Sequence, residues 1–219
     1  MKHYKSVILL DLDGTISDSE RGITKAFQYA LEQCGISIDT PSDLRKFIGP
    51  TIRKVLKESY NFNDSNAEKV IEKYREYYLE KGIFDTNMYD GIDVMLKELK
   101  GLDKTLILAT SKPAVQAKQI LEYFDIDKYF SFVSGAELDG HRSEKREVIE
   151  YAMKMNNIYD VDNCIMVGDR KYDIMGARAV GMESIGVLYG YSSEGELTEA
   201  GADYIVESVE ELSVLLCKM

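Results

Sequence analysis

Short apolar segments alternate along this chain with segments in which apolar residues recur at helical spacing. Runs that are apolar throughout are typical of strands buried on both faces of a parallel sheet, and the segments between them are typical of helices that cover it. The pattern therefore predicts an α/β fold with a doubly wound, Rossmann-like parallel sheet. The expected strands are Val7–Leu10, Leu106–Ala109, Phe130–Val133, Cys164–Val167, Ser184–Leu188 and Tyr204–Val206.

The stretch from about Thr15 to Asp85 interrupts this alternation, because it shows apolar stripes at helical spacing and no run typical of a strand. One stripe ends at Gly35, a residue type that commonly follows the last turn of a helix. An additional helical layer packed on the sheet is one interpretation. The position directly after the first strand favours a cap, because α/β proteins bind ligands at that edge. We expect an all-helical cap domain over residues 15–86, inserted into a core domain formed by residues 1–14 and 87–219.

The composition limits the partners of the protein. Lysine and arginine number 27 against 38 acidic residues, a net charge of −11, which argues against nucleic acid or an anionic membrane as the main partner. No apolar run can span a bilayer, and Asp11 interrupts the first run too early for a signal peptide. The odd number of widely spaced cysteines (Cys34, Cys164 and Cys217) is typical of a reducing compartment. We expect a cytoplasmic monomer or homodimer that acts on a small molecule.

The first expected strand leads directly into the acidic segment Asp11-Leu12-Asp13-Gly14-Thr15. Aspartate and glycine are common in turns, so a simple turn is one interpretation. A calcium loop of the EF-hand type is excluded, because Thr15 and Gly22 stand where acidic ligands are required and Ile16 stands where glycine is required. Two carboxylates at the end of a buried strand otherwise indicate a site at the edge of the sheet.

The second expected strand leads into the polar segment Thr110-Ser111-Lys112-Pro113. This segment reads as the start of a helix, with Pro113 at the first helical position. Its hydroxyl groups and backbone amides would suit an anion, and simple capping of the helix is the alternative.

Two further helix starts carry charged residues. Asp169 follows the fourth expected strand, and Asp173 stands four residues later in the same helix start. Capping of that helix, helped by its dipole, is the alternative to a functional role. Lys145 opens another expected helix, where a lone lysine is otherwise a solvated charge.

Because the carboxyl ends of parallel strands lie at one edge of the sheet, these polar segments can converge. Carboxylates that gather there repel one another unless a cation neutralises them, and oxygen ligands without histidine or cysteine point to Mg²⁺. Magnesium in proteins commonly keeps several waters and binds substrate phosphate. The pattern therefore predicts a Mg²⁺ site that handles a phosphate ester.

The combined motifs resemble those of the haloacid dehalogenase-like (HAD) hydrolase superfamily, in particular its phosphatases with an α-helical, C1-type cap. The resemblance covers essentially the whole chain. Within the superfamily the chain looks most like the phosphoglycolate phosphatase group, which also contains nucleotidase-like members. The motifs that carry the resemblance to the superfamily are Asp11-x-Asp13-Gly14-Thr15, Thr110-Ser111-Lys112, Lys145 and Gly168-Asp169-x₃-Asp173. Two further segments resemble the phosphoglycolate phosphatase group, namely Leu44–Pro50 and Tyr89-Asp90-Gly91.

The resemblance implies that Asp11 attacks phosphorus and forms an aspartyl phosphate, a covalent intermediate that divides one difficult step into two. It implies that Mg²⁺ is held by Asp11, by Asp169 and by the backbone carbonyl of Asp13, where it offsets the repulsion between carboxylate and phosphate. The side chain of Asp13 is then expected to protonate the departing oxygen and later to accept a proton from water.

The other motif residues receive supporting roles from the same resemblance. Lys145 is expected to neutralise phosphate oxygens and to orient Asp11. Thr110 and the backbone amide of Ser111 are expected to bind another phosphate oxygen. Asp173 is expected to orient Lys145 or a water at the metal. Other lysines available for the role of Lys145 are Lys112, Lys128 and Lys154.

We therefore expect a Mg²⁺-dependent phosphatase that hydrolyses a small phosphomonoester, such as a phosphoglycolate-like or nucleoside-monophosphate-like substrate. A sugar-phosphate mutase with the same cap type is an alternative, as are a phospho-accepting switch and a catalytically idle binding scaffold. Cap side chains are expected to select the substrate, unless they only form surface charge and cap core. The candidates are Arg45, Lys46 and Arg53 for an anionic group and Phe47 for a base or ring.

Overall fold

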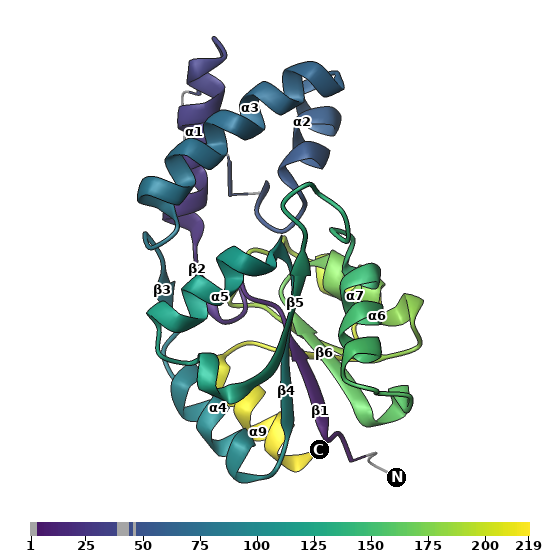
Figure 1. Ribbon diagram of the computed structural model, residues 1–219. Coiled ribbons are helices and arrows are strands. Elements are labelled where there is room, and N and C mark those ends of the chain that lie inside the picture. Colours follow the sequence, from purple (N-terminus) through teal and green to yellow (C-terminus); the bar gives the residue numbers. More distant parts are fainter. Residues whose placement is uncertain (1–3, 39–43, 46) are drawn as a thin grey trace. The chain divides into compact units, whose positions relative to one another are not determined.

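The structure of the protein is a computed structural model that describes residues 4–38, 44–45 and 47–219 (Figure 1). Within these residues the chain divides into two compact units. The first unit comprises the chain up to Ser17 and from Met88 onward, and the second comprises Asp18–Asn87. A helical region is thus inserted into an α/β unit, which confirms the predicted fold class.

The first unit is built around one sheet in which all neighbouring strands are parallel. The strands are β1 (Val7–Leu10), β4 (Thr105–Pro113), β5 (Phe130–Ala136), β6 (Cys164–Gly168), β7 (Glu183–Val187) and β8 (Tyr204–Val206). Among the described residues the sheet has six strands in the order β5-β4-β1-β6-β7-β8. The order reverses direction between β1 and β6, as it does in a doubly wound sheet.

Strand β4 differs from the prediction, because it continues to Pro113 and includes the whole segment Thr110-Ser111-Lys112. Pro113 pairs with Ala136 of β5, after an irregularity in register that begins at Ala109. The following helix α5 (Ala114–Tyr123) has Pro113 as its N-cap and not as its first helical residue. The expectation that Thr110 and Ser111 open a helix is therefore wrong, because pairing with β5 keeps the segment extended.

Both faces of the sheet are buried. Val7 and Leu9 of β1 lie in an apolar cluster with residues of α6 (Lys145–Met155) and α7 (Lys171–Ala179). The alternate residues Ile8 and Leu10 are also fully buried. Helices α4 (Ile92–Gly101), α5 and α9 (Val209–Lys218) lie on the other side of the sheet (Figure 1). The strands are apolar throughout because helices cover them from both sides.

The second unit is helical. Its elements are α1 (Glu20–Gln33), α2 (Ile52–Tyr60), α3 (Asp64–Tyr77) and the π-helical turn η2 (Tyr78–Gly82). The buried residues of α1 recur at helical spacing and so form one apolar face. One of them is Phe27, whose ring lies 5.4 Å from the ring of Tyr74 in α3. The side chains of Thr51 and Asn63 accept hydrogen bonds from backbone amides in the first turns of α2 and α3, which stabilises both helix starts.

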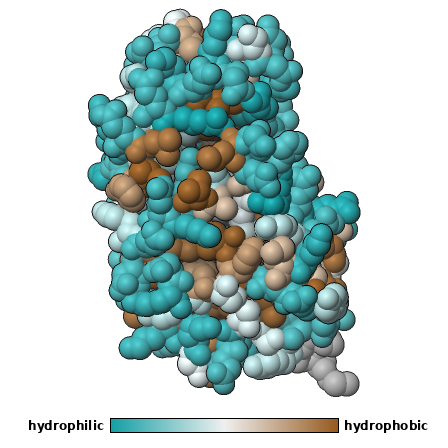
Figure 2. Space-filling model, viewed as in Figure 1, coloured by the Kyte–Doolittle hydropathy of each residue, from teal (hydrophilic) through white to brown (hydrophobic). Residues whose placement is uncertain are grey.

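The remaining elements are short. They are β2 (Ser17–Asp18), β3 (Asn87–Met88), η3 (Asp127–Tyr129), η4 (Val161–Asn163) and α8 (Glu196–Ala200). Strands β2 and β3 pair with each other where the chain passes between the units. Hydrophilic side chains cover most of the face shown in Figure 2, and apolar groups interrupt them. None of the helices in the described part of the chain is both long and apolar enough to cross a membrane.

Two helical glycines provide a matched test of this packing. A Cβ on Gly22 of α1 would overlap the carbonyl oxygen of Gly82, whereas a Cβ on Gly101 of α4 would meet no described atom within 4 Å. Alanine is favoured over glycine in a helix by up to about 1 kcal/mol, so Gly101→Ala is expected to raise the melting temperature slightly. Gly22→Ala is expected to lower it, because overpacking by about 1–3 kcal/mol outweighs that gain. Thermal unfolding of both variants measures the two shifts, and shifts of the same sign would contradict the packing described for Gly22.

Candidate active site

The strand order brings Asp11 and Asp169 together. Asp11 directly follows β1 and Asp169 directly follows β6, and these two strands are neighbours at the point where the order reverses. The backbone amide of Asp11 donates a hydrogen bond to the carbonyl oxygen of Val167 in β6, at 2.9 Å. Doubly wound proteins bind ligands at this switch point, beyond the carboxyl ends of the strands.

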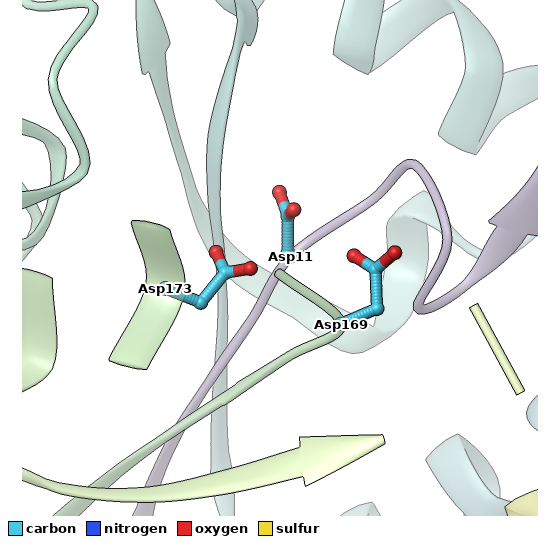
Figure 3. Close-up of side chains that lie close together, drawn as sticks. All are labelled: Asp11, Asp169 and Asp173. Atoms are coloured by element: carbon cyan, nitrogen blue, oxygen red, sulfur yellow. The ribbon is translucent and has the colours of Figure 1, made fainter. Parts of the chain in front are cut away.

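Asp173 completes a cluster of three buried carboxyl groups with Asp11 and Asp169. One oxygen from each of the three groups lies within 4.8 Å of the others. Figure 3 shows Asp11 between the other two, with all three carboxyl groups converging. Asp173 lies in the first turn of α7, and its Oδ2 accepts a hydrogen bond from the amide of Arg170 at 3.1 Å. One oxygen of Asp173 therefore stabilises the start of α7, as the capping alternative expects. Asp169 does not cap this helix, because the N-cap residue is Arg170.

Lys145, the first residue of α6, joins two of these carboxylates. Its Nζ lies 2.9 Å from Asp11 Oδ1 and 2.7 Å from Asp173 Oδ1, and it donates a hydrogen bond to the carbonyl oxygen of Ala109 at 2.9 Å. The ammonium group thus lies within 3 Å of three oxygen atoms, two of which belong to carboxylates. Burial lowers the pKa of Lys145, but the charges of Asp11 and Asp173 outweigh this effect and raise it above its ordinary value. Lys145 is therefore protonated in the folded protein.

The cluster carries more negative charge than Lys145 offsets. Burial raises the pKa of Asp169 well above its usual range, and the neighbouring carboxylates of Asp173 and Asp11 add to this effect. Burial also raises the pKa of Asp173 to about 6, although Lys145 opposes the shift. Arg170, which follows Asp169, is paired with Glu196 at 2.9 Å. Three carboxylates against one ammonium leave room for a divalent cation, and oxygen donors suit a hard ion.

The surroundings of the two carboxylate oxygens of Asp169 support a metal site. Its Oδ2 accepts a hydrogen bond from the backbone amide of Tyr191 at 2.7 Å. Its Oδ1 is buried and has no hydrogen-bond partner among residues 4–38, 44–45 and 47–219. A buried carboxylate oxygen without a partner is costly, and a metal ion would satisfy it. The cluster can therefore hold a metal.

Three glycines make room for the buried acids. A Cβ on Gly14 or on Gly190 would overlap the side chain of Asp169, and a Cβ on Gly168 would overlap the side chain of Asp173. Gly14 also has a φ of +85°, which favours glycine. Gly190 and Tyr191 are not among the residues predicted from the sequence. The signal available for them was the segment Tyr189-Gly190-Tyr191 directly after the fifth predicted strand.

Asp13 lies apart from the three-carboxylate cluster and is paired with a different lysine. Lys112 Nζ donates a hydrogen bond to Asp13 Oδ2 at 2.6 Å, and both side chains are largely buried. The side chain of Thr110 is buried, and its Oγ1 accepts a hydrogen bond from the amide of Lys112 at 3.3 Å. Ser111, which lies between Thr110 and Lys112 in the sequence, is half-buried. The sequence leaves Lys112 as an alternative to Lys145, and the structure instead gives the two lysines separate carboxylates.

The predicted substrate residues lie in the second unit and have contacts there. Arg45 is exposed and forms an ion pair with Glu20 at 3.3 Å. The ring of Phe47 is half-buried, 6.2 Å from the ring of Phe27 and 6.0 Å from that of Tyr60. Arg53 is paired with Glu68 and Asp64, and Lys46 lies outside the described residues.

Comparison with known proteins agrees with this geometry. A 5'-nucleotidase of Pseudomonas aeruginosa is 39% identical over 190 residues, which are 87% of this chain and 86% of that protein. A phosphoglycolate phosphatase of Vibrio parahaemolyticus is 28% identical over 94% of this chain and 93% of its own. The crystal structure of a predicted phosphatase from Clostridium acetobutylicum is 45% identical, with a TM-score of 0.96 over 99% of this chain and 100% of that one.

The model of the haloacid dehalogenase-like hydrolase family matches residues 8–187, which include most of β1, the strands β4 and β6 and every acid of the cluster. The expected relationship to phosphoglycolate phosphatases is confirmed by relatives that span almost the whole chain. This protein therefore belongs to the haloacid dehalogenase-like hydrolases and is an enzyme of their phosphatase type.

Proposed function

We propose that the protein hydrolyses small-molecule phosphomonoesters in a Mg²⁺-dependent reaction that forms an aspartyl phosphate on Asp11. The observation that carries this proposal is the surplus of buried carboxylate around Lys145, with one oxygen of Asp169 left without a partner in the described structure. Phosphoglycolate-like and nucleoside-monophosphate-like compounds are the proposed substrates. The names of the similar proteins, phosphoglycolate phosphatase and 5'-nucleotidase, support both classes.

The residues present fit a magnesium ion. We assign Asp11, Asp169 and the backbone carbonyl of Asp13 as its protein ligands, since all are hard oxygen donors. When bound, the ion offsets the repulsion between the Asp11 carboxylate and a phosphate dianion. We assign Asp173 the role of orienting Lys145, which the 2.7 Å ion pair supports.

Asp11 is the proposed nucleophile. Lys145 binds its Oδ1 and so restricts rotation of the carboxyl group, and we assign Oδ2 to attack phosphorus. The geometry supports the orienting role of Lys145 more than direct neutralisation of phosphate, because a phosphate oxygen would have to replace one of the three existing acceptors. Thr110 and the amide of Ser111 remain the proposed ligands of a phosphate oxygen.

Asp13 is the proposed acid and base, and residues 15–86 are the proposed cap. In the first step Asp13 protonates the oxygen that leaves phosphorus, and in the second it accepts a proton from the water that hydrolyses the aspartyl phosphate. Arg45 and Phe47 are the proposed substrate contacts of the cap.

The proposed location is the cytoplasm. Cys34, Cys164 and Cys217 form no disulfide, which supports this location.

Replacement of the nucleophile tests the proposed function. Asp11→Asn removes the attacking carboxylate with little change in shape, so turnover is expected to fall by at least roughly 1000-fold. Asp103→Asn is the matched control, because Asp103 is exposed and its φ of 57° is tolerated by asparagine. The measurement is phosphate release from a panel of phosphoglycolate, nucleoside monophosphates and sugar phosphates with Mg²⁺. Residual Asp11→Asn activity within about tenfold of the wild type would remove Asp11 as the nucleophile.

Without metal, the stability of the protein is expected to decrease as the pH rises. Burial raises the pKa of Asp173 to about 6 and the pKa of Asp169 well above its usual range, so both groups favour the protonated form in the folded protein. A carboxyl group whose pKa is higher in the folded than in the unfolded chain stabilises the fold at low pH and loses this contribution as the pH rises through the folded value. EDTA-treated protein should therefore melt at a lower temperature at about pH 7.5 than at about pH 5.

Mg²⁺ is expected to reverse this loss. Because the ion displaces protons from its ligands, it should raise the melting temperature more at about pH 7.5 than at about pH 5. Asp169→Asn should remove most of the Mg²⁺-dependent shift. Thermal scans with EDTA, Mg²⁺ and the variant measure this, and a shift that survives Asp169→Asn unchanged would argue against the proposed metal site.

A further inference from the structure

The ion pair between Asp13 and Lys112 is a second group of buried charges, separate from the pairs that Lys145 forms. The two residues are 99 positions apart, their charged atoms lie 2.6 Å from each other, and their side chains are only 13% and 6% exposed. Removing two charges from water is unfavourable unless the geometry is good. Asp13 is not a member of the three-carboxylate cluster, so Lys112 is paired with an acid outside that cluster.

The two oxygens of Asp13 differ in their surroundings. Oδ2 accepts the hydrogen bond of Lys112. Oδ1 is buried and makes no hydrogen bond to any residue in the described part of the chain. One oxygen is thus anchored and the other is presented without a partner, an arrangement that fixes the rotation of the carboxyl group. A group that transfers protons benefits from such fixation, because proton transfer requires the correct distance and direction.

The position of Lys112 is itself well defined. It lies in β4, and its amide donates to Thr110 Oγ1 at 3.3 Å. A Cβ on Gly135 of β5 would approach the carbonyl oxygen of Lys112 to 2.6 Å, so glycine at this position allows the two strands to lie close together. Lys112 therefore projects from the last part of β4, next to Pro113, which pairs with Ala136 of β5.

Lys145 has other partners. Its Nζ donates a hydrogen bond to the carbonyl oxygen of Ala109 and forms ion pairs with Asp11 and Asp173. Each lysine thus fixes a different carboxylate. Lys145 holds the proposed nucleophile, and Lys112 holds the proposed acid and base.

We propose that Lys112 is a positioning residue for proton transfer by Asp13, an inference that rests on the proposed phosphatase function. Lys112 holds Oδ2 while Oδ1 takes up a proton from solvent before the reaction. In the first step Oδ1 gives this proton to the ester oxygen as the bond from that oxygen to phosphorus breaks and Asp11 bonds to phosphorus. In the second step water bonds to phosphorus and gives its proton to Oδ1, the bond between Asp11 and phosphorus breaks, and phosphate leaves.

The test compares esters of similar shape that differ in how much they need a proton. Dinitrophenolate leaves without protonation, whereas phenolate depends on it. In Lys112→Met, kcat/KM for phenyl phosphate is expected to fall by roughly 100-fold, in the lower range for general acid catalysis. For 2,4-dinitrophenyl phosphate the same variant should lose less than about 5-fold, because this ester does not need the acid. The ratio of the two values does not depend on the folded fraction, so partial unfolding cannot produce it.

Two further variants make the result specific. Lys128→Met removes an exposed lysine that is paired with Asp125 at 2.5 Å, and it should leave both values unchanged. In the Asp13→Asn background, Lys112→Met should cause little additional loss, because the two residues act as a unit. Equal losses for both esters, or additive losses in the double variant, would overturn the role of Lys112. A wild-type protein inactive on every ester would instead overturn the phosphatase function and the proposal with it.

Discussion

Repulsion among three buried carboxylates is the constraint on which the rest of the active-site edge depends. Asp11, Asp169 and Asp173 lie together away from water, where like charges interact strongly. The chain meets this constraint with a buried ammonium group that touches two of the acids and with a backbone amide that binds the third. Glycines leave the space that these acids occupy. The remaining negative charge is what makes the site suitable for a divalent cation.

The doubly wound sheet explains how residues from distant parts of the chain meet. The strands β1, β4 and β6 are neighbours and end at the same edge, so the residues that follow them are brought close together without long loops. Two further residues of the site come from the first turns of helices. They are Lys145 in α6 and Asp173 in α7. Groups at such positions are held by regular backbone and packed side chains, which gives the site its defined distances.

The sequence was sufficient for the fold class and for the residues of the cluster, because apolar runs and strand-end acids are local signals. It was not sufficient where a distant segment decides the outcome. Thr110 to Pro113 read as a helix start, but pairing of Pro113 with Ala136 keeps them in β4. The amide of Tyr191 has no side-chain signature at all. The pairing of Lys112 with Asp13 was also not predictable, because a lone lysine is usually solvated and only the fold shows which acid it meets.

The buried, paired ammonium group of Lys145 has a chemical consequence. Acylating reagents react with an amine through its lone pair, which a protonated nitrogen does not offer. Nζ of Lys145 is buried, donates a hydrogen bond to Ala109 and is held in the charged form by the carboxylates of Asp11 and Asp173. An exposed lysine such as Lys171 lacks this burial. The contacts that hold Asp11, the proposed nucleophile, therefore also shield the amine of Lys145 from acetylation and similar covalent modification.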